Sequence, residues 1–428
     1  MRIERTLRKL GLLALGLFIP ELGMAAAGDG VAHYVVKLTA DFERQELRGD
    51  EVIAFEAAGD VAELEKQSGV RVKGVPLAGD GRQGAPESQT LRIHLEKPGK
   101  QVLHFEYTAG AGRGLRWVDE KSGMFTAFYC DAWMICDNKP GQRATLRLEI
   151  VLPAGSGLVA AGPGRAQKPF TDAEGVHFVF EQHEPAQTYL FSFGIAKLES
   201  AEDGIFRLYA KEGGHAVALR KTAEVYAFLR GKAGVDVIDG AYTQVFLPVV
   251  GEGFGQEAAG SALMSEKYLA NLEKKDDVQL MAHEMAHQWW GVSVGVRSWS
   301  DFWLNEGMAE FMSDAYLEAH QSKTAYDEQM TELRKRLVEL KAEGKDRPLH
   351  WEAWADAHEA LGQIPYVKGA LFLDRLRKEL GEEKFWRGMA LYTKRNAGRL
   401  VDSGDFERAM EEGSGQDLKA VFQDGVYR

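Results

Sequence analysis

The chain has 428 residues, of which 45% are hydrophobic and 27% are charged, a composition typical of a globular protein of two or three domains. This composition excludes a collagen-like, coiled-coil or wholly disordered chain. The formal net charge of −12 disfavours nucleic acid as a partner, because proteins that bind it usually present a basic surface.

The first 27 residues have the order of a secretory signal peptide. Four basic residues within the first nine are followed by an apolar run over 10–19 and by three alanines at 25–27. The apolar run is shorter than the ~20 residues that a membrane-spanning helix needs. The sequence therefore predicts an exported protein, periplasmic or secreted, that does not insert stably into a membrane. An uncleaved anchor helix is the alternative.

Residues 28–203 are predicted to form an antiparallel all-β domain. Short segments of alternating apolar and polar residues, separated by Gly, Pro and Asp, lie at 33–42, 89–97, 101–109, 145–152, 176–182 and 188–198. This domain also contains Cys130 and Cys136. In an exported protein these cysteines could form a disulfide, and two buried thiols on one strand are the alternative.

Residues 204–428 show the longer hydrophobic period of helices. The segments predicted to be helical are 215–234, 278–291, 302–320, 325–344, 366–381 and 382–398, and one strand is predicted at 243–250. The predicted fold class is therefore α+β, with an N-terminal β domain followed by a mostly helical domain.

The residues that indicate catalysis lie in the second of these predicted helices. The segment from His283 to His287 has the pattern H-E-x-x-H, and positions i and i+4 share one face of a helix. Both imidazoles could therefore bind one ion, for which Zn²⁺ is suited because it favours nitrogen ligands. Glu284 would then act as the base towards a water molecule on the metal. A surface helix that binds no metal is the alternative.

A catalytic zinc ion needs a third protein ligand and one open position. Eighteen residues separate His287 from Glu306, which lies within Trp-Leu-Asn-Glu-Gly. This interval allows a second helix to pack against the first with Glu306 facing the metal. Glu310 lies one turn later on the same face and is the alternative ligand.

The H-E-x-x-H pattern, the interval of eighteen residues, Glu306 within WLNEG and HQWWG after the second histidine together resemble the gluzincin metallopeptidases of the aminopeptidase N family. The resemblance implies a thermolysin-like catalytic domain from about 204 to the end, with one Zn²⁺ per chain. It implies His283, His287 and Glu306 as the metal ligands, and Glu284 as the general base and acid.

The resemblance also implies a residue that stabilises the transition state. Residues 364–370 are similar to the family's Tyr-x-Lys-Gly segment, whose tyrosine donates a hydrogen bond to the tetrahedral oxyanion. Tyr366 is therefore implied as a second catalytic residue, because a phenol opposite the metal stabilises charge that develops only in the transition state. Without the resemblance, a structural tyrosine at the start of a helix would be the expectation.

The segment implied to recognise the substrate departs from the family. At the place of the Gly-x-Met-Glu-Asn motif this chain has Phe-Gly-Gln-Glu-Ala at 254–258, which retains only Glu257. Glu257 is implied to bind the free α-ammonium group of a peptide, and Gln256 or Glu252 could share this role. The β domain has Ala127 where the family usually has a glutamine, so a second contact to the ammonium group is expected to be missing.

The sequence thus predicts an exported zinc metallopeptidase that removes N-terminal residues from peptides by attack of zinc-bound water. A zinc endopeptidase or a dipeptide-releasing enzyme is one alternative, which the altered loop leaves open, and a non-catalytic peptide-binding scaffold is the other. The chain stops near the expected end of the catalytic domain, so it resembles a short form without the family's C-terminal helical domain, and a more open cleft is expected. The enzyme is expected to be a monomer whose partners are peptide substrates.

Overall fold

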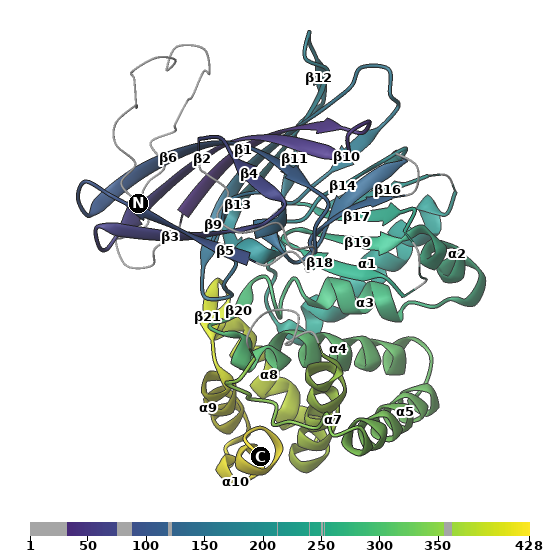
Figure 1. The fold of residues 1–428 in the computed structure, drawn as a ribbon. Coiled ribbons are helices and arrows are strands. Elements are labelled where there is room, and N and C mark those ends of the chain that lie inside the picture. Colours follow the sequence, from purple (N-terminus) through teal and green to yellow (C-terminus); the bar gives the residue numbers. More distant parts are fainter. Residues whose placement is uncertain are drawn as a thin grey trace.

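The computed structural model describes residues 32–74, 88–118, 122–211, 213–238, 240–249, 251, 253–354 and 362–428. The predicted signal peptide and Glu252 lie outside these residues. Figure 1 shows a strand-rich N-terminal half, in purple and blue, packed against a C-terminal half, in green and yellow, that consists mostly of helices. In the described part of the chain, no helix is both long and apolar enough to cross a membrane.

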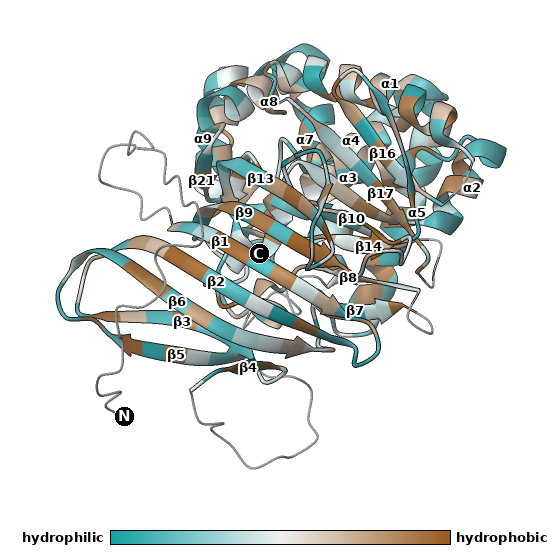
Figure 2. Cartoon of the chain, turned by 90° about the horizontal axis from the view of Figure 1, so that it is seen from above, coloured by the Kyte–Doolittle hydropathy of each residue, from teal (hydrophilic) through white to brown (hydrophobic). Residues whose placement is uncertain are grey.

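The N-terminal half is built from strands whose side chains alternate between core and surface. These strands are β1 (Ala32–Asp41), β2 (Glu46–Ala57), β3 (Val61–Gln67), β4 (Val70–Val72), β5 (Ser88–His94), β6 (Gly99–Gly110), β7 (Leu115–Val118), β8 (Gly123–Thr126), β9 (Arg143–Leu152), β10 (Val159–Ala161), β11 (Arg165–Ala166), β12 (Phe170–Thr171), β13 (Val176–Gln187) and β14 (Gly194–Ala196). In β1, Val36 and Leu38 are buried whereas Thr39 is exposed. Figure 2 shows the same alternation of hydrophobic and hydrophilic residues along β1, β2 and β9.

These strands form three sheets, and the predicted β domain is confirmed. The largest sheet has the order β11-β13-β9-β1-β2-β6-β4 with β12 added to β13, and the smaller sheets are β10-β14-β8-β7 and β3-β5. One pair departs from the predicted antiparallel arrangement, because β1 and β9 run parallel, with Val36 beside Leu148. A parallel pair needs a long connection, and here the chain passes through β2 to β8 before β9 returns to the sheet.

Cys130 and Cys136 form a disulfide, with their Cα atoms 6.2 Å apart. Both cysteines are fully buried, and the bridge closes a segment that begins with the short 3-10 helix η2 (Cys130–Ala132). The backbone N–H of Ile135 in this segment donates a hydrogen bond of 2.9 Å to the buried carboxylate of Glu51 on β2. Of the two possibilities that the sequence allowed, a disulfide or two buried thiols, the structure therefore has the disulfide.

The C-terminal half begins with a five-stranded sheet of its own. Its strands are β15 (Glu199–Asp203), β16 (Phe206–Ala210), β17 (Tyr242–Leu247), β18 (Gly255–Ala258) and β19 (Ser261–Ser265), in the order β15-β16-β17-β19-β18. The first of these strands lies before residue 204 and pairs with β16, and the domain boundary at 203/204 stays a prediction. The last strand in the order, β18, is an edge strand that runs antiparallel to β19. A further parallel pair joins β20 (Val294–Val296) to β21 (Arg399–Val401).

Helices make up most of the remaining chain. They are α1 (His215–Ala233), α2 (Glu266–Lys275), α3 (Gln279–Ala286), α4 (Trp303–His320), α5 (Lys323–Ala342), α7 (Gln363–Leu380), α8 (Glu382–Asn396), α9 (Ser403–Ser414) and α10 (Lys419–Gly425). All six predicted helices are confirmed, although α3 ends at Ala286 rather than at 291. The chain leaves the helix there because Trp289 and Trp290 turn into the core and Gly291 adopts a φ of +144°.

Apolar side chains connect the two halves. A cluster joins the sheet β10-β14-β8-β7 to strands β17 and β19, and it consists of Val118, Phe125, Ala161, Ala196, Leu198, Val245, Leu247, Val249 and Leu263. Gly194 in β14 allows this approach, because a Cβ atom there would lie 2.9 Å from the Leu247 side chain. The two halves therefore share a core.

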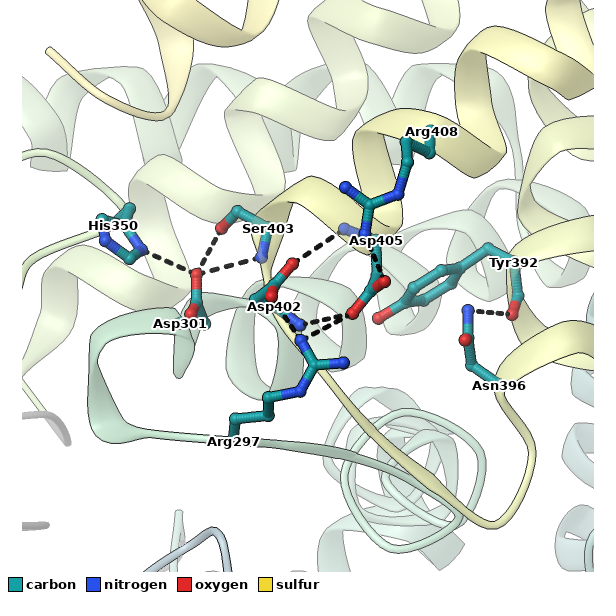
Figure 3. A network of polar contacts seen from close by, with 9 residues as sticks. All are labelled: Arg297, Asp301, His350, Tyr392, Asn396, Asp402, Ser403, Asp405 and Arg408. Atoms are coloured by element: carbon teal, nitrogen blue, oxygen red, sulfur yellow. Dashed lines mark hydrogen bonds and ion pairs between the residues drawn. The ribbon is translucent and has the colours of Figure 1, made fainter.

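A polar network fixes the start of α4 against the C-terminal helices (Figure 3). The Asp301 Oδ1 atom accepts hydrogen bonds from His350 Nδ1 at 2.8 Å and from the backbone N–H and hydroxyl of Ser403 at 3.1 and 2.5 Å. The indole N–H of Trp303 donates to the same hydroxyl at 2.9 Å. Because Trp303 is the first residue of α4 and Asp301 lies two residues before it, this network positions the helix that carries Glu306.

Candidate active site

Two helices bring the three predicted metal ligands together. His283 lies in α3, His287 directly follows that helix with helical φ and ψ, and Glu306 lies in the first turn of α4. The Glu306 Oε2 atom lies 3.4 Å from the Nε2 atoms of both histidines. One ligand atom from each residue therefore lies within 4.8 Å of the other two.

This arrangement fits a zinc ion, which binds imidazole nitrogen and carboxylate oxygen in catalytic sites with one position left open. Glu306 is 1% exposed, and its Oε2 atom has no hydrogen-bond partner among the described residues. Burial raises the pKa of Glu306, but the two imidazoles outweigh this effect and lower it to about 2. An ionised, buried oxygen that faces two imidazole nitrogens is suited to a cation.

The far nitrogen of each imidazole has its own acceptor. His283 Nδ1 lies 3.1 Å from Glu310 Oε2, and His287 Nδ1 lies 2.6 Å from Asn305 Oδ1 and 3.3 Å from the carbonyl oxygen of Trp290. Such contacts set the tautomer that leaves Nε2 free to bind metal. Glu310, the alternative ligand, therefore contacts the nitrogen of His283 that faces away from Glu306.

Glu284 lies beside the metal ligands with one oxygen available. It is 4% exposed, and its Oε2 atom meets no hydrogen-bond donor in the described part of the chain. Burial raises the pKa of Glu284, and the neighbouring histidines oppose this shift. Gly255 on β18 provides the space, because a Cβ atom there would overlap the Glu284 carboxylate. A carboxylate whose pKa is raised in this way can both accept and donate a proton.

Tyr366 projects from the first turn of α7 towards the same place. Its ring stacks on that of His283, with centroids 5.9 Å apart and planes 9° apart. Burial raises the pKa of Tyr366 well above its usual value, and Glu306 contributes. The phenol is therefore protonated at neutral pH and is a hydrogen-bond donor.

Glu257 brings a further carboxylate into the group from the edge strand β18. One of its oxygens lies within 4.8 Å of ligand atoms of Glu284 and His287. Its Oε1 atom accepts from Asn305 Nδ2 at 3.3 Å and its Oε2 atom accepts from Gln256 Nε2 at 2.8 Å. Burial raises the pKa of Glu257 to about 8. Each oxygen has one donor, so lone pairs remain for an ammonium group.

Gln256, the other residue predicted to bind substrate, directs its side-chain amide to Glu257. Besides the carboxylate, its amide donates to the backbone oxygen of Glu257 at 2.9 Å. Ala127 of the N-terminal half packs against the apolar cluster that also contacts Phe254, three residues before Glu257. Phe254 and Phe125 stack edge to face at 5.1 Å, so the N-terminal half supports this loop.

Two residues of the site were not identified from the sequence. Asn305 is one, and Gln288 is the other. The side chain of Gln288 accepts from Gly260 N at 3.0 Å and donates to the carbonyl oxygens of Ala258 at 3.0 Å and Ser261 at 3.4 Å. It therefore binds the turn between β18 and β19 to the end of the metal-binding segment. The only feature of the sequence that could have indicated this role is the position of Gln288 directly after His287.

Comparison with known proteins shows, independently of the geometry of the site, which proteins the chain is similar to. Residues 242–424 match the family model described as Peptidase family M1 domain. The chain is 23% identical over 424 residues to a probable aminopeptidase 1 of Sulfurisphaera tokodaii, covering 91% of this chain and 52% of the relative. It is 28% identical over 286 residues to an aminopeptidase N of Canis lupus familiaris, covering 60% of this chain and 29% of that protein. The chain thus spans about half or less of these curated relatives.

Solved structures show the same fold over nearly the whole chain. An M1 zinc metallopeptidase from Deinococcus radiodurans is similar with a TM-score of 0.73 and 21% identity, over 93% of both chains. A yeast LTA4 hydrolase in complex with bestatin is similar with a TM-score of 0.78 and 19% identity, over 93% of this chain and 68% of that one.

Proposed function

The chain belongs to the aminopeptidase N family of gluzincin zinc metallopeptidases, peptidase family M1, and from this premise we propose that it is a zinc-dependent aminopeptidase. The observation that carries the proposal is the position of Glu257. A buried carboxylate with free lone pairs lies within 4.8 Å of both the proposed base and a metal ligand. A peptide whose ammonium group bound there would have its first peptide bond close to the metal.

The residues of the site have complementary roles in this reaction. His283, His287 and Glu306 would hold the zinc ion, which supplies a Lewis acid that polarises the scissile carbonyl and acidifies water. Glu284 would accept the proton of the attacking water and transfer it to the leaving amide nitrogen. The Tyr366 phenol would donate a hydrogen bond to the oxygen on which negative charge develops.

The altered recognition loop favours a second candidate, a zinc endopeptidase or dipeptide-releasing enzyme. The Gln256 amide already donates a hydrogen bond to Glu257, and Ala127 has no polar side chain to add a second contact to an ammonium group. An ammonium group that is held by one carboxylate alone would select less strongly for a free N-terminus.

Hydrolysis of matched free and N-acetylated peptides, followed by mass spectrometry with and without a chelator, tests the proposal. We expect chelator-sensitive release of single residues from free N-termini only. Internal cleavage, or equal cleavage of acetylated peptides, would favour the endopeptidase. Absence of cleavage by the zinc-loaded protein would leave only a peptide-binding scaffold. The Glu284→Gln variant, which keeps all three ligands, is the matched inactive control.

We also propose that the protein is exported, to the periplasm or outside the cell, and acts as a monomer. The basic, apolar and small-residue order of the first 27 residues supports export. The buried Cys130–Cys136 disulfide is consistent with it, since disulfides persist mainly in oxidising compartments. Fractionation of cells and light scattering of the purified protein test these two points.

A further inference from the structure

Asn305 lies between a metal ligand and the carboxylate proposed to bind the substrate. Its Oδ1 atom is 2.6 Å from His287 Nδ1, and its Nδ2 atom is 3.3 Å from Glu257 Oε1. Its side chain is almost fully buried, with 1% exposed. One amide therefore contacts both His287 and Glu257.

Chemistry fixes the orientation of this amide. When His287 Nε2 faces the metal, Nδ1 carries the proton and requires an acceptor, which is Oδ1 of Asn305. The carboxylate of Glu257 can only accept when it is ionised, and Nδ2 supplies the donor. The flipped amide would place two donors against each other at His287 and two acceptors at Glu257. The two contacts therefore support one and the same rotamer.

Gly291 leaves space for the Asn305 side chain. A Cβ atom on Gly291 would overlap the Asn305 Oδ1 atom, and Gly291 has a φ of +144°, which favours glycine. Asn305 also precedes Glu306 in α4, so its backbone moves with that ligand.

We propose that Asn305 is a positioning residue that couples His287 to Glu257, and through them the metal centre to recognition of the substrate's ammonium group. Loss of either contact frees the amide to rotate and weakens the other contact. The inference rests on the proposed function only in giving Glu257 the role of binding an ammonium group.

Glu310 provides a matched control. It holds His283 as Asn305 holds His287, through Nδ1 at 3.1 Å. Among the described residues, however, no hydrogen bond joins Glu310 to Glu257. Substitution of Glu310 should loosen a metal ligand without affecting the orientation of Glu257.

The test is a double-mutant cycle on zinc affinity, measured by competition of Zn²⁺ alone against a fluorescent chelator. The variants are Asn305→Ala, Glu257→Ala and their combination, with Glu310→Ala and its combination with Glu257→Ala as the control cycle. Asn305→Ala should lower zinc affinity about 10-fold, the low end for loss of a ligand's partner, because the Trp290 carbonyl remains as an acceptor. Glu257→Ala should lower the zinc affinity of the parent by some factor, and that factor should be at least three times as large as the one by which it lowers the zinc affinity of the Asn305→Ala variant. In the Glu310→Ala variant, Glu257→Ala should lower zinc affinity by the same factor as in the parent.

A second variant separates the two contacts. Asn305→Asp keeps the acceptor for His287 but replaces the donor to Glu257 with a carboxylate oxygen, so zinc affinity should be retained while the KM of free peptides rises at least 10-fold at saturating zinc. Glu310→Ala should leave that KM within threefold.

The outcomes distinguish this inference from the proposed function. If Glu257→Ala changes zinc affinity equally with and without Asn305, the coupling does not exist. If Asn305→Ala does not fold, Asn305→Asp decides, and an unchanged zinc affinity together with an unchanged KM overturns the proposal. If the parent protein shows no preference for free N-termini, the proposed function fails, and the zinc cycle still decides whether Asn305 couples His287 to Glu257.

Discussion

Two carboxylates beside the proposed metal ligands, Glu257 and Glu284, have different surroundings. Glu257 has a donor on each oxygen, whereas Glu284 has an oxygen without a donor among the residues that the structure describes. A base must exchange its proton during turnover, so the unpaired oxygen is suited to Glu284. A recognition residue must keep a fixed orientation, and the two donors provide it for Glu257.

Glu284, the proposed base, can be tested by a substitution that replaces one carboxylate oxygen with an amide nitrogen. Glu284→Gln keeps the size of the side chain and removes its ability to accept a proton, so kcat should fall by about 10²- to 10⁴-fold. Zinc content should be unchanged, because the three ligands are intact. Steady-state kinetics together with metal analysis check both parts, and a variant with parental kcat would remove Glu284 from its role.

A histidine distant from the site gives a prediction for pH. His177 lies 2.9 Å from Glu149 and 2.8 Å from Asp172. Burial lowers the pKa of His177, but the two carboxylates outweigh this effect and raise it above its usual value. A raised pKa in the folded state means that the stabilisation is complete below about pH 6.5 and is lost as the pH rises through the folded-state pKa.

His177→Gln should therefore lower Tm more at pH 6 than at pH 9. Thermal unfolding of the parent and the variant at both values measures the two differences. Equal differences would mean that the charge on His177 does not contribute to stability.

At the scale of elements, the close crossing of α4 and α7 brings Glu306 and Tyr366 to the same place. A Cβ atom on Gly369 would lie 2.7 Å from the Cα atom of Gly307, so the helices touch through their backbones. Each glycine lies within one turn of a site residue, since Gly307 follows Glu306 and Gly369 comes three residues after Tyr366.

Gly369→Ala should separate these helices. Overpacking of this kind costs about 1–3 kcal/mol of stability, and kcat should fall because the Tyr366 phenol moves relative to the metal ligands. Gly231→Ala in α1 is the matched control, because no heavy atom of the described residues lies within 4 Å of its added Cβ atom. That variant should be neutral or more stable by up to about 1 kcal/mol. Tm and kcat of both variants check the comparison.

The sequence predicted elements with a strong hydrophobic period and missed shorter ones. Helices α2, α9 and α10 have 10, 12 and 7 residues and offer few turns over which a period can be recognised. The sequence does contain one signal for α9, the spacing of Asp402 and Asp405, whose reciprocal hydrogen bonds cap the start of this helix. The three candidate metal ligands, which the structure brings together, could be proposed from the sequence because two of them have a local spacing and one interval links them to the third. Asn305 and Gln288 were not, because their roles depend on contacts across 18 to 48 residues.

At the scale of the whole molecule, zinc should contribute to stability because its proposed ligands come from two segments, α3 with the residue that follows it and α4. Binding of an ion to the folded state alone stabilises it by about 4 kcal/mol when the free ion is a thousand times its Kd. Removal of zinc by a chelator should therefore lower Tm, and return of zinc should restore it. Thermal unfolding checked against metal content tests this, and an unchanged Tm in protein free of metal would contradict it.

The turn between β18 and β19 receives hydrogen bonds from both halves of the chain. On one side it is bound by Gln288, and on the other Ala259 donates to Leu190 at 3.0 Å and accepts from Gly164 N at 3.1 Å. The strand that carries Glu257 thus takes its position from residues of the β domain as much as from the metal-binding helix. The residues proposed to recognise a peptide and those proposed to cleave it are therefore not separable modules. If the proposed function holds, a C-terminal half joined to an unrelated β domain would lose its selectivity before its chemistry.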